Sequence, residues 1–412
     1  MEVSNQILSH PRVLPKLFFV EMWERFSYYG MRALLVLYLV KSMGLNDSQA
    51  GLIYGGYTSL VYLTPLIGGY LADKFLGLRL SIGIGAYLML FGHFSLALDH
   101  KFFFFFGLML LVIGNGFFKP NMSTLIGVLY TDRPALRDSG FTIFYMGINL
   151  GAFVGPLLTG YLAEALGWHF GFGLAAGGLA LGIALFHFTK IQIPEEPLDT
   201  AKIIQSSDEE EKATKLILWM SFFSIFFWMA FEQMGSSLNL FADRYIEREV
   251  LGFLVPTAWF QSINPIFILL FAPILTWMWG KKKSHPFKKF SMALLLLGLG
   301  FLVLVLVLSM GGKEKIPLYW LVLAYFWHTI GELYISPTGL SFVSSTAPKD
   351  RASLLMGIWF LSNAVAHFLG GLFSGAMELD MKLFFGFFVV TSWSASLALY
   401  LFYKSQNRNA SF

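Results

Sequence analysis

The stretch Glu21–Gly30, EMWERFSYYG, places three charged residues in the middle of an apolar run that extends from about residue 14 to residue 40. An apolar run of this length is long enough to cross a lipid bilayer as one helix. A charged side chain at the centre of such a helix costs about 2.5–3.5 kcal/mol on insertion scales. Ionisable residues kept there therefore indicate a functional site in a membrane protein.

The spacing of the polar residues in this stretch gathers them on one side of the predicted helix. Glu21 and Arg25 are four residues apart, so they share a face and partly neutralise each other. Tyr28, Tyr29 and Arg32 extend the same face by two more turns. A structural ion pair between helices is the alternative interpretation, but such a pair does not require a second base and two phenols beside it.

The composition of the whole chain supports a membrane protein. The 412 residues are 56% hydrophobic and only 13% charged, and they include 44 Phe, 17 Tyr and 11 Trp. The chain contains no cysteine, which excludes disulfides, thiolate metal sites and thiol nucleophiles. The net charge of +4 comes from basic residues in short loops between apolar runs, a pattern that indicates membrane topology rather than nucleic-acid binding.

The chain contains a series of apolar runs of membrane length, separated by one long polar segment. This segment, residues 191–215, predicts a cytoplasmic linker between two groups of six spans, residues 1–190 and 216–412. Nineteen of the 29 Lys and Arg lie in alternate loops on one side and seven on the other, which predicts that both termini are cytoplasmic. The predicted spans are 14–40, 48–72, 80–98, 102–130, 140–163, 170–189, 216–240, 256–279, 290–310, 318–346, 352–375 and 383–403.

The pattern E-x-x-E-R-F-x-Y-Y-G of residues 21–30 resembles the first-helix signature of the proton-dependent oligopeptide transporters, a branch of the major facilitator superfamily. The resemblance implies an all-α membrane protein with 12 transmembrane helices in two six-helix bundles. Many bacterial members carry two extra helices between the bundles, and this chain has only the linker there. The implied function is proton-coupled import of di- and tripeptides by alternating access, without a cofactor or metal, by a monomer in the plasma membrane (the inner membrane of a bacterium).

Further motifs in the first six spans support this resemblance. Tyr62 resembles a tyrosine that faces the peptide, and Lys119 resembles the lysine of the fourth helix. Asn149 ends an F-Y-x-x-I-N motif and offers a donor and an acceptor to a peptide backbone; packing against a neighbouring helix is the alternative for this residue. Asp73 and Arg79 resemble the cytoplasmic latch between spans two and three, which controls conformation and does not contact substrate.

The last six spans carry the complementary acids. Glu232 and Glu332 lie inside spans seven and ten, and Ser336 shares a helix face with Glu332. Asn264 precedes a proline in span eight, and Trp359 lies in span eleven. The two acids, Asn264 and Trp359 resemble positions that line the family's central cavity, although ordinary packing and hydrogen bonds at a helix break remain open for Asn264 and Trp359.

The distribution of charge suggests a zwitterionic substrate. Arg25, Arg32 and Lys119 belong to the first bundle, and Glu232 and Glu332 to the second, so these groups are expected to face one another across a wet interface. The carboxylate of a dipeptide suits the basic bundle, ideally through a bidentate contact with Arg, and its ammonium suits Glu332.

The resemblance also implies how protons act on the transporter. Two inter-bundle ion pairs, Arg32–Glu232 and Lys119–Glu332, would close the extracellular side, and protonation of a carboxylate would break such a pair. The candidate proton-coupling residues are Glu21, Glu24 and Glu232, with Arg25 as the partner of the first two.

Two other functions are compatible with parts of the pattern. A facilitator of another substrate, such as nitrate, a drug or a sugar derivative, uses the same fold. A membrane-embedded enzyme with buried carboxylates as acid and base is the other alternative, but the charges are spread over both bundles and no metal triad or activated nucleophile is evident. The histidines of the predicted spans are interpreted as packing residues; they are His93, His187, His328 and His367.

Overall fold

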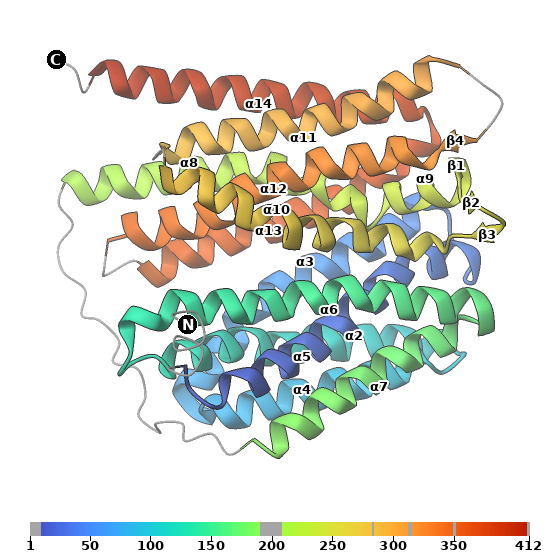
Figure 1. The fold of residues 1–412 in the computed structure, drawn as a ribbon, viewed down its shortest axis with the longest axis horizontal. Coiled ribbons are helices and arrows are strands. Elements are labelled where there is room, and N and C mark those ends of the chain that lie inside the picture. The colour runs from blue at the N-terminus through green and yellow to red at the C-terminus, as the bar shows by residue number, and fades with distance from the viewer. Residues whose placement is uncertain (1–9, 190–207, 282–283, 312–314, 349–351, 410–412) are drawn as a thin grey trace. The chain divides into compact units, whose positions relative to one another are not determined.

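The computed structural model shows a nearly all-helical protein. It describes residues 10–189, 208–281, 284–311, 315–348 and 352–409 (Figure 1). The chain divides into two compact units, and the first helical hairpin contributes to both of them. The first unit is Met1–Leu35 with Leu63–Asp199, and the second is Val36–Tyr62 with Thr200–Phe412.

In the first unit, long helices pack side by side through small residues. Helix α4 packs against α5 and α7, and α6 packs against α7 (Figure 1). The backbones of α4 and α5 come very close, because a Cβ atom at Gly85 would lie only 2.6 Å from the carbonyl oxygen of Gly114. The helices are α2 (Leu14–Lys41), α3 (Asp47–Leu71), η1 (Ala72–Leu76), α4 (Leu78–Leu96), α5 (Lys101–Val128), η2 (Pro134–Leu136), α6 (Arg137–Leu166) and α7 (Trp168–His187).

The second unit combines the last part of α2 and the first part of α3 with the rest of the chain. Within it, α11 packs against α12 and α14, and α8 packs against α13. Its further helices are α8 (Asp208–Phe231), η3 (Glu232–Met234), α9 (Ser237–Tyr245), η4 (Thr257–Ser262), α10 (Ile263–Lys281), α11 (Pro286–Ser309), α12 (Leu318–Thr346), α13 (Ala352–Ser374), η5 (Gly375–Glu378) and α14 (Met381–Asn409).

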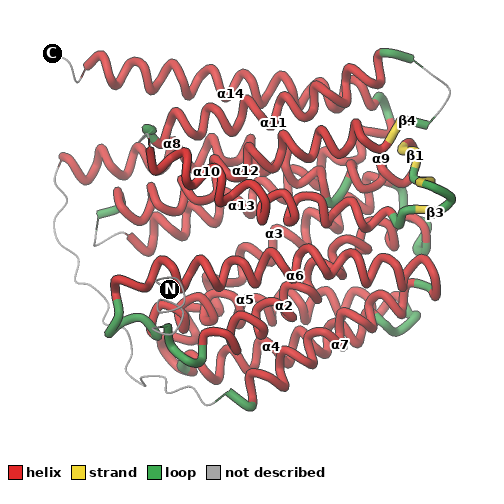
Figure 2. The backbone as a smooth tube through the Cα atoms, in the orientation of Figure 1, coloured by secondary structure: helices red, strands yellow, loops and turns green. Residues whose placement is uncertain are grey.

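Four strands of two residues each lie at one end of the second unit (Figure 2). Strand β1 (Ile246–Glu247) pairs in parallel with β4 (Ile316–Pro317). Strand β2 (Glu249–Val250) pairs with β3 (Phe253–Leu254) as a short antiparallel hairpin. The sequence analysis predicted only helices, because two-residue strands inside a loop leave no periodic pattern to detect.

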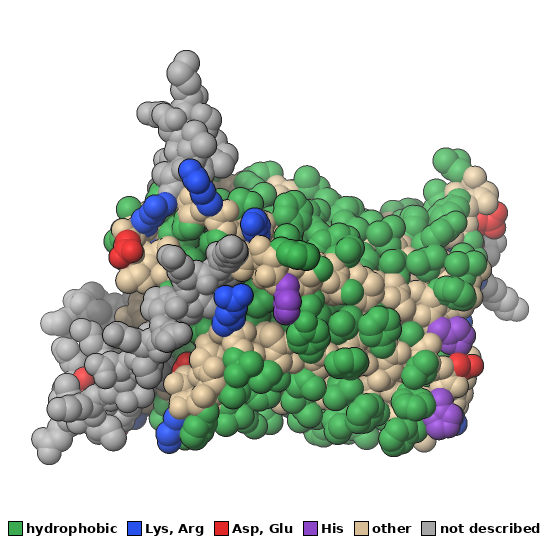
Figure 3. Space-filling model, turned by 90° about the horizontal axis from the view of Figure 1, so that it is seen from below, with side chains coloured by type: hydrophobic (Ala, Val, Ile, Leu, Met, Phe, Trp, Pro, Cys, Tyr) green, Lys and Arg blue, Asp and Glu red, His purple; other side chains and the backbone are tan. Residues whose placement is uncertain are grey.

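The helices have the length and apolar surface of membrane spans. Within the described part of the chain, nine helical segments are long and apolar enough to cross a bilayer. Helix α2 is not among them because the charges of its central stretch interrupt every apolar window. Figure 3 shows one face on which hydrophobic side chains cover the middle and Lys and Arg gather near one end. These features define a multi-pass membrane protein.

The observed helices follow the predicted runs closely, with two differences. Helix α12 has the bounds of the predicted run 318–346. The predicted run 216–240 is instead a broken helix, in which α8 ends at Phe231 and α9 begins at Ser237. Helix α8 also begins at Asp208, inside the predicted linker 191–215, and the earlier part of that linker lies outside the described residues.

Candidate functional site

The charged stretch of α2 forms a buried cluster in the first unit. The guanidinium of Arg25 binds both carboxylate oxygens of Glu24, with Nη2 donating to Oε1 at 2.7 Å and Nε to Oε2. Glu21 is a second, more distant partner, whose Oε1 lies 3.4 Å from Nε. All three residues are at most 4% exposed. The predicted Glu21–Arg25 contact is therefore present, but the adjacent Glu24 provides the bidentate contact.

One oxygen of this cluster lacks a partner. Oε2 of Glu21 is buried and has no hydrogen-bond partner among the described residues. Both oxygens of Glu24, in contrast, accept bonds from Arg25. Two buried carboxylates therefore share one guanidinium, and Glu21 is the less satisfied of the two.

Aromatic and basic residues extend this cluster along α2, as the spacing predicted. The guanidinium of Arg25 lies 5.0 Å from the centroid of the Tyr28 ring. The Tyr28 and Tyr29 rings meet edge to face at 5.1 Å, and Arg32 lies 5.9 Å from the Tyr29 centroid. The two arginine–tyrosine distances fall in the range of cation–π interactions. The residues from Arg25 to Arg32 that share the predicted helix face therefore form a continuous set of contacts.

Lys119 of α5 belongs to the same group of charges. It interacts electrostatically with Glu21, Glu24, Arg25 and Arg32. The first unit therefore brings together the basic residues that the sequence predicted for it, with two acids among them.

The backbones of helices α6 and α2 pack very close to each other. A Cβ atom at Gly151 would lie 2.2 Å from the carbonyl oxygen of Met22 and 3.0 Å from Cβ of Arg25, so only glycine fits there. Asn149, two residues earlier on α6, is buried and donates from Nδ2 to the carbonyl oxygen of Tyr145 at 3.0 Å. In this structure Asn149 therefore forms a hydrogen bond within its own helix.

In the second unit, the predicted residues of α10 and α12 meet. Nδ2 of Asn264 donates to Oε2 of Glu332 at 2.7 Å and lies 3.1 Å from Oγ1 of Thr329. Thr329 donates in turn to the carbonyl oxygen of Tyr325 one turn earlier. Asn264 thus holds the Glu332 carboxylate in a fixed orientation, and Ser336 lies one turn further along α12.

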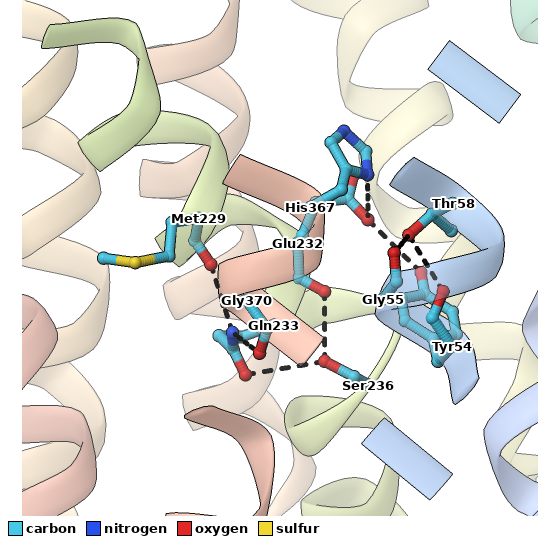
Figure 4. A network of polar contacts seen from close by, with 9 residues as sticks. All are labelled: Tyr54, Gly55, Thr58, Met229, Glu232, Gln233, Ser236, His367 and Gly370. Atoms are coloured by element: carbon cyan, nitrogen blue, oxygen red, sulfur yellow. Dashed lines mark hydrogen bonds and ion pairs between the residues drawn. The ribbon is translucent and has the colours of Figure 1, made fainter. Parts of the chain in front are cut away.

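Glu232 lies at the break between α8 and α9. It is 4% exposed, and its Oε2 accepts a hydrogen bond from the Tyr54 hydroxyl at 3.3 Å (Figure 4). The adjacent Gln233 donates from Nε2 to the carbonyl oxygens of Met229 at 3.1 Å and Gly370 at 2.9 Å. Ser237 donates to Oε1 of Gln233 at 2.6 Å, so side chains replace the helical hydrogen bonds that the break removes.

Two predicted binding residues make packing contacts in the second unit. Trp359 is buried with its ring against Phe290 and Gly339, where a Cβ atom would lie 2.3 Å from the indole. The Tyr62 ring packs against the imidazole of His367, with 4.5 Å between ring centroids and a 40° tilt.

The predicted cytoplasmic latch lies in and after the π-helical turn η1. Asp73 and Arg79 form no ion pair with each other among the residues described in the first unit. Partial burial raises the pKa of Asp73 above its ordinary value. The ammonium of the neighbouring Lys74 donates a hydrogen bond to the Tyr70 hydroxyl at 2.9 Å.

The sequence did not predict the contacts of several polar residues around Glu232. Gln233, Tyr54 and His367 contact it or brace the helix break. Gln233 was detectable, since it follows a buried acid in an apolar run. His367 was assigned to packing because the sequence gives no sign of its distant carboxylate partner. The two predicted gating pairs each join residues of different units, and they remain predictions.

The sequence matches that of a known class of transporters. The model of the POT family matches residues 79–209 and 197–387 of this chain. The chain is 36% identical to the peptide transporter YePEPT of Yersinia enterocolitica, over 92% of this chain and 90% of the relative. The chain therefore belongs to the POT family.

Further comparisons agree with this assignment. The dipeptide and tripeptide permease A of Proteus mirabilis is 32% identical over 91% of this chain and 88% of its own length. The crystal structure of a POT family transporter in complex with 5-aminolevulinic acid is similar with a TM-score of 0.89 and 30% identity. That match covers 95% of this chain and 96% of the other.

Proposed function

We propose that this protein is a proton-coupled symporter that imports di- and tripeptides by alternating access. The observation that carries the proposal is the buried group of charges in the first unit, where Arg25 and Lys119 lie with two acids in a member of the POT family. The names of the relatives, a peptide transporter and a dipeptide and tripeptide permease, support the choice of substrate.

In this proposal the basic residues of the first unit and the acid of the second would contact the two ends of a zwitterion. Arg25, Arg32 and Lys119 would attract the peptide carboxylate, and Glu332, oriented by Asn264, would accept hydrogen bonds from the ammonium. Tyrosines and Asn149 would contact the peptide between its ends, and the buried Trp359 would support the wall of the site. The complete proposed set is Arg25, Tyr28, Tyr29, Arg32, Tyr62, Lys119, Asn149, Asn264, Glu332, Ser336 and Trp359.

The first helix is the proposed place of proton coupling. Arg25 neutralises Glu24 through two hydrogen bonds, whereas Glu21 keeps one buried oxygen without a hydrogen-bond partner among the described residues. A buried carboxylate in that position is stabilised by taking up a proton. Glu21 would therefore carry the coupled proton, and Glu24 would hold Arg25 ready for the substrate carboxylate.

Closure would depend on the ion pairs Arg32–Glu232 and Lys119–Glu332 on the extracellular side and on Asp73 and Arg79 on the cytoplasmic side. The protein would have twelve transmembrane helices without extra inter-bundle helices, with both termini on the same side, and the distribution of Lys and Arg would make that side the cytoplasm. It would act as a monomer in the inner membrane of a bacterium. The transporter would use protons and no cofactor, and it would catalyse no chemical reaction.

The substrate proposal is tested by counterflow in proteoliposomes loaded with unlabelled dialanine. Labelled dialanine is expected to enter, and other dipeptides and tripeptides are expected to compete with it. N-acetylated or C-amidated dialanine should compete weakly, because each lacks one charged end. Absence of dialanine counterflow, together with counterflow of nitrate or a sugar derivative in liposomes loaded with that compound, would favour the facilitator of another substrate.

A further inference from the structure

His367 lies against the carboxylate of Glu232 in the second unit. Nδ1 of His367, on α13, is 3.3 Å from Oε2 of Glu232, at the break between α8 and α9 (Figure 4). His367 is 1% exposed and Glu232 is 4% exposed. This is an ion-pair contact between two ionisable groups that are both removed from water.

Groups from helix α3 complete the surroundings of the pair. The Tyr54 hydroxyl donates to the same oxygen of Glu232 that faces His367, and the Tyr62 ring packs against the imidazole with 4.5 Å between ring centroids and a 40° tilt. Nδ1 of His367 meets Glu232 as an ion-pair contact and not as a hydrogen bond, and Nε2 is likewise buried without a hydrogen-bond partner among the described residues. The imidazole is therefore held between a phenol ring and a carboxylate, in contrast to a histidine that packs among apolar side chains.

The backbone around His367 is fixed, so the contact follows from the packing of three elements. A Cβ atom at Gly55 of α3 would lie 2.7 Å from Cα of Gly371 and 2.8 Å from the carbonyl oxygen of His367. Nε2 of Gln233 donates to the carbonyl oxygen of Gly370. Helix α3, helix α13 and the helix break thus meet at the residues that carry the pair.

A buried pair of this kind favours one bound proton. With one proton the pair is neutral overall, either as imidazolium with carboxylate or as imidazole with carboxylic acid. With no proton it is a buried anion, and with two protons it is a buried cation, and both are strongly disfavoured away from water. Imidazole is the side chain that gains and loses its proton near neutral pH.

We propose that His367 and Glu232 together bind one proton that is exchanged during transport, which makes His367 a proton-binding residue of the transporter. This inference rests on the proposed function. Within the second unit, Tyr54 and Tyr62 of α3 are the described ionisable groups that contact the pair. The predicted partner Arg32 would neutralise Glu232 in place of the proton.

The test compares His367→Gln with a matched control, His328→Gln. His328 is also a histidine of the second unit with no exposed surface, but it lies against Gly300 and the Phe301 ring, without a carboxylate contact among the described residues. Dialanine counterflow is measured with equal pH on both sides, across the range in which an imidazole titrates. His367→Asn replaces the glutamine variant if that variant does not fold.

His367→Gln is expected to move the pH of half-maximal exchange by about one unit or more toward acid, because the proton then binds a lone carboxylate, which is a weaker base than the imidazole that has been removed. His328→Gln is expected to keep the wild-type profile. A His367→Gln profile that coincides with the wild type would overturn the proposal, and so would an equal shift in both variants. Absence of counterflow in the wild type would instead contradict the proposed function, so the two failures are distinguishable.

Discussion

Replacement of Arg25 by methionine removes the one guanidinium that Glu21 and Glu24 share. The two carboxylates that remain are less than 5% exposed, and removal of one partner from a buried ion pair costs about 3–5 kcal/mol. Lys119 interacts with both acids and offsets part of this cost, so we expect the lower end of the range. For a unit of this size, about 3 kcal/mol corresponds to a decrease of roughly 6–12 °C in Tm.

The assay is thermal unfolding of the purified protein in detergent, with variants that separate the pair from its parts. Glu24→Gln should lower Tm less than Arg25→Met, because Glu21 remains 3.4 Å from Arg25 and continues to neutralise it. The double variant Glu24→Gln/Arg25→Met should be more stable than Arg25→Met alone, since one uncompensated charge is gone. Arg137→Met, at an exposed arginine of the same unit, is the control and should change Tm by less than about 2 °C. A melting curve of Arg25→Met within that limit, or additive losses in the double variant, would refute the reasoning.

Three further predictions concern the second unit. Arg244→Met should lower Tm more than Asp47→Asn. The Arg244 variant leaves the Asp47 carboxylate, which is 1% exposed, without the guanidinium that binds both its oxygens at 2.6 Å, whereas in the Asp47 variant the partly exposed Arg244 can hydrate. Equal decreases in Tm would contradict this prediction. Gly55→Leu should prevent the packing of α3 on α13 and yield little folded protein, whereas Gly56→Leu should be tolerated because nothing lies within 4 Å of a Cβ atom there; size-exclusion profiles of the two variants decide. Asn264→Ala removes a charge-assisted hydrogen bond to Glu332, worth about 1.5–3 kcal/mol, and should raise KM for dialanine roughly 10- to 150-fold; an unchanged KM in folded protein would show that the orientation of Glu332 does not matter for binding.

The sequence predicted most of the helices because the bilayer imposes a length and an apolar composition on each span. It also identified Glu21, Glu24, Arg25 and Lys119, since a charge in an apolar run is anomalous whatever its partners. In the structure Arg25 binds Glu24 and lies 3.4 Å from Glu21, and Lys119 interacts electrostatically with all three. The choice of Glu24 as the bidentate partner of Arg25 was not predictable, because it depends on side-chain conformations and on how closely α6 approaches.

Features that depend on partners distant in the chain could not be predicted from the sequence. The break after Phe231 is held by contacts of Gln233 with α13, and the helical run around it looks continuous in hydropathy. His367 resembled other apolar-helix histidines until the fold placed it beside Glu232. The pairing of β1 with β4 likewise joins loops far apart in the chain, whereas β2 and β3 form a local hairpin too short to leave a periodic pattern.

The most direct test of peptide–proton symport is the accumulation of labelled dialanine in proteoliposomes with an inward proton gradient, for wild type and Glu21→Gln. We predict that the wild type accumulates dialanine only when the gradient is present and that an ionophore abolishes the accumulation. We predict that Glu21→Gln loses gradient-driven accumulation but retains counterflow exchange. Equal uptake by the wild type with and without the gradient would contradict the coupling. Absence of dialanine uptake and exchange by verified folded protein would contradict the transport of peptides itself.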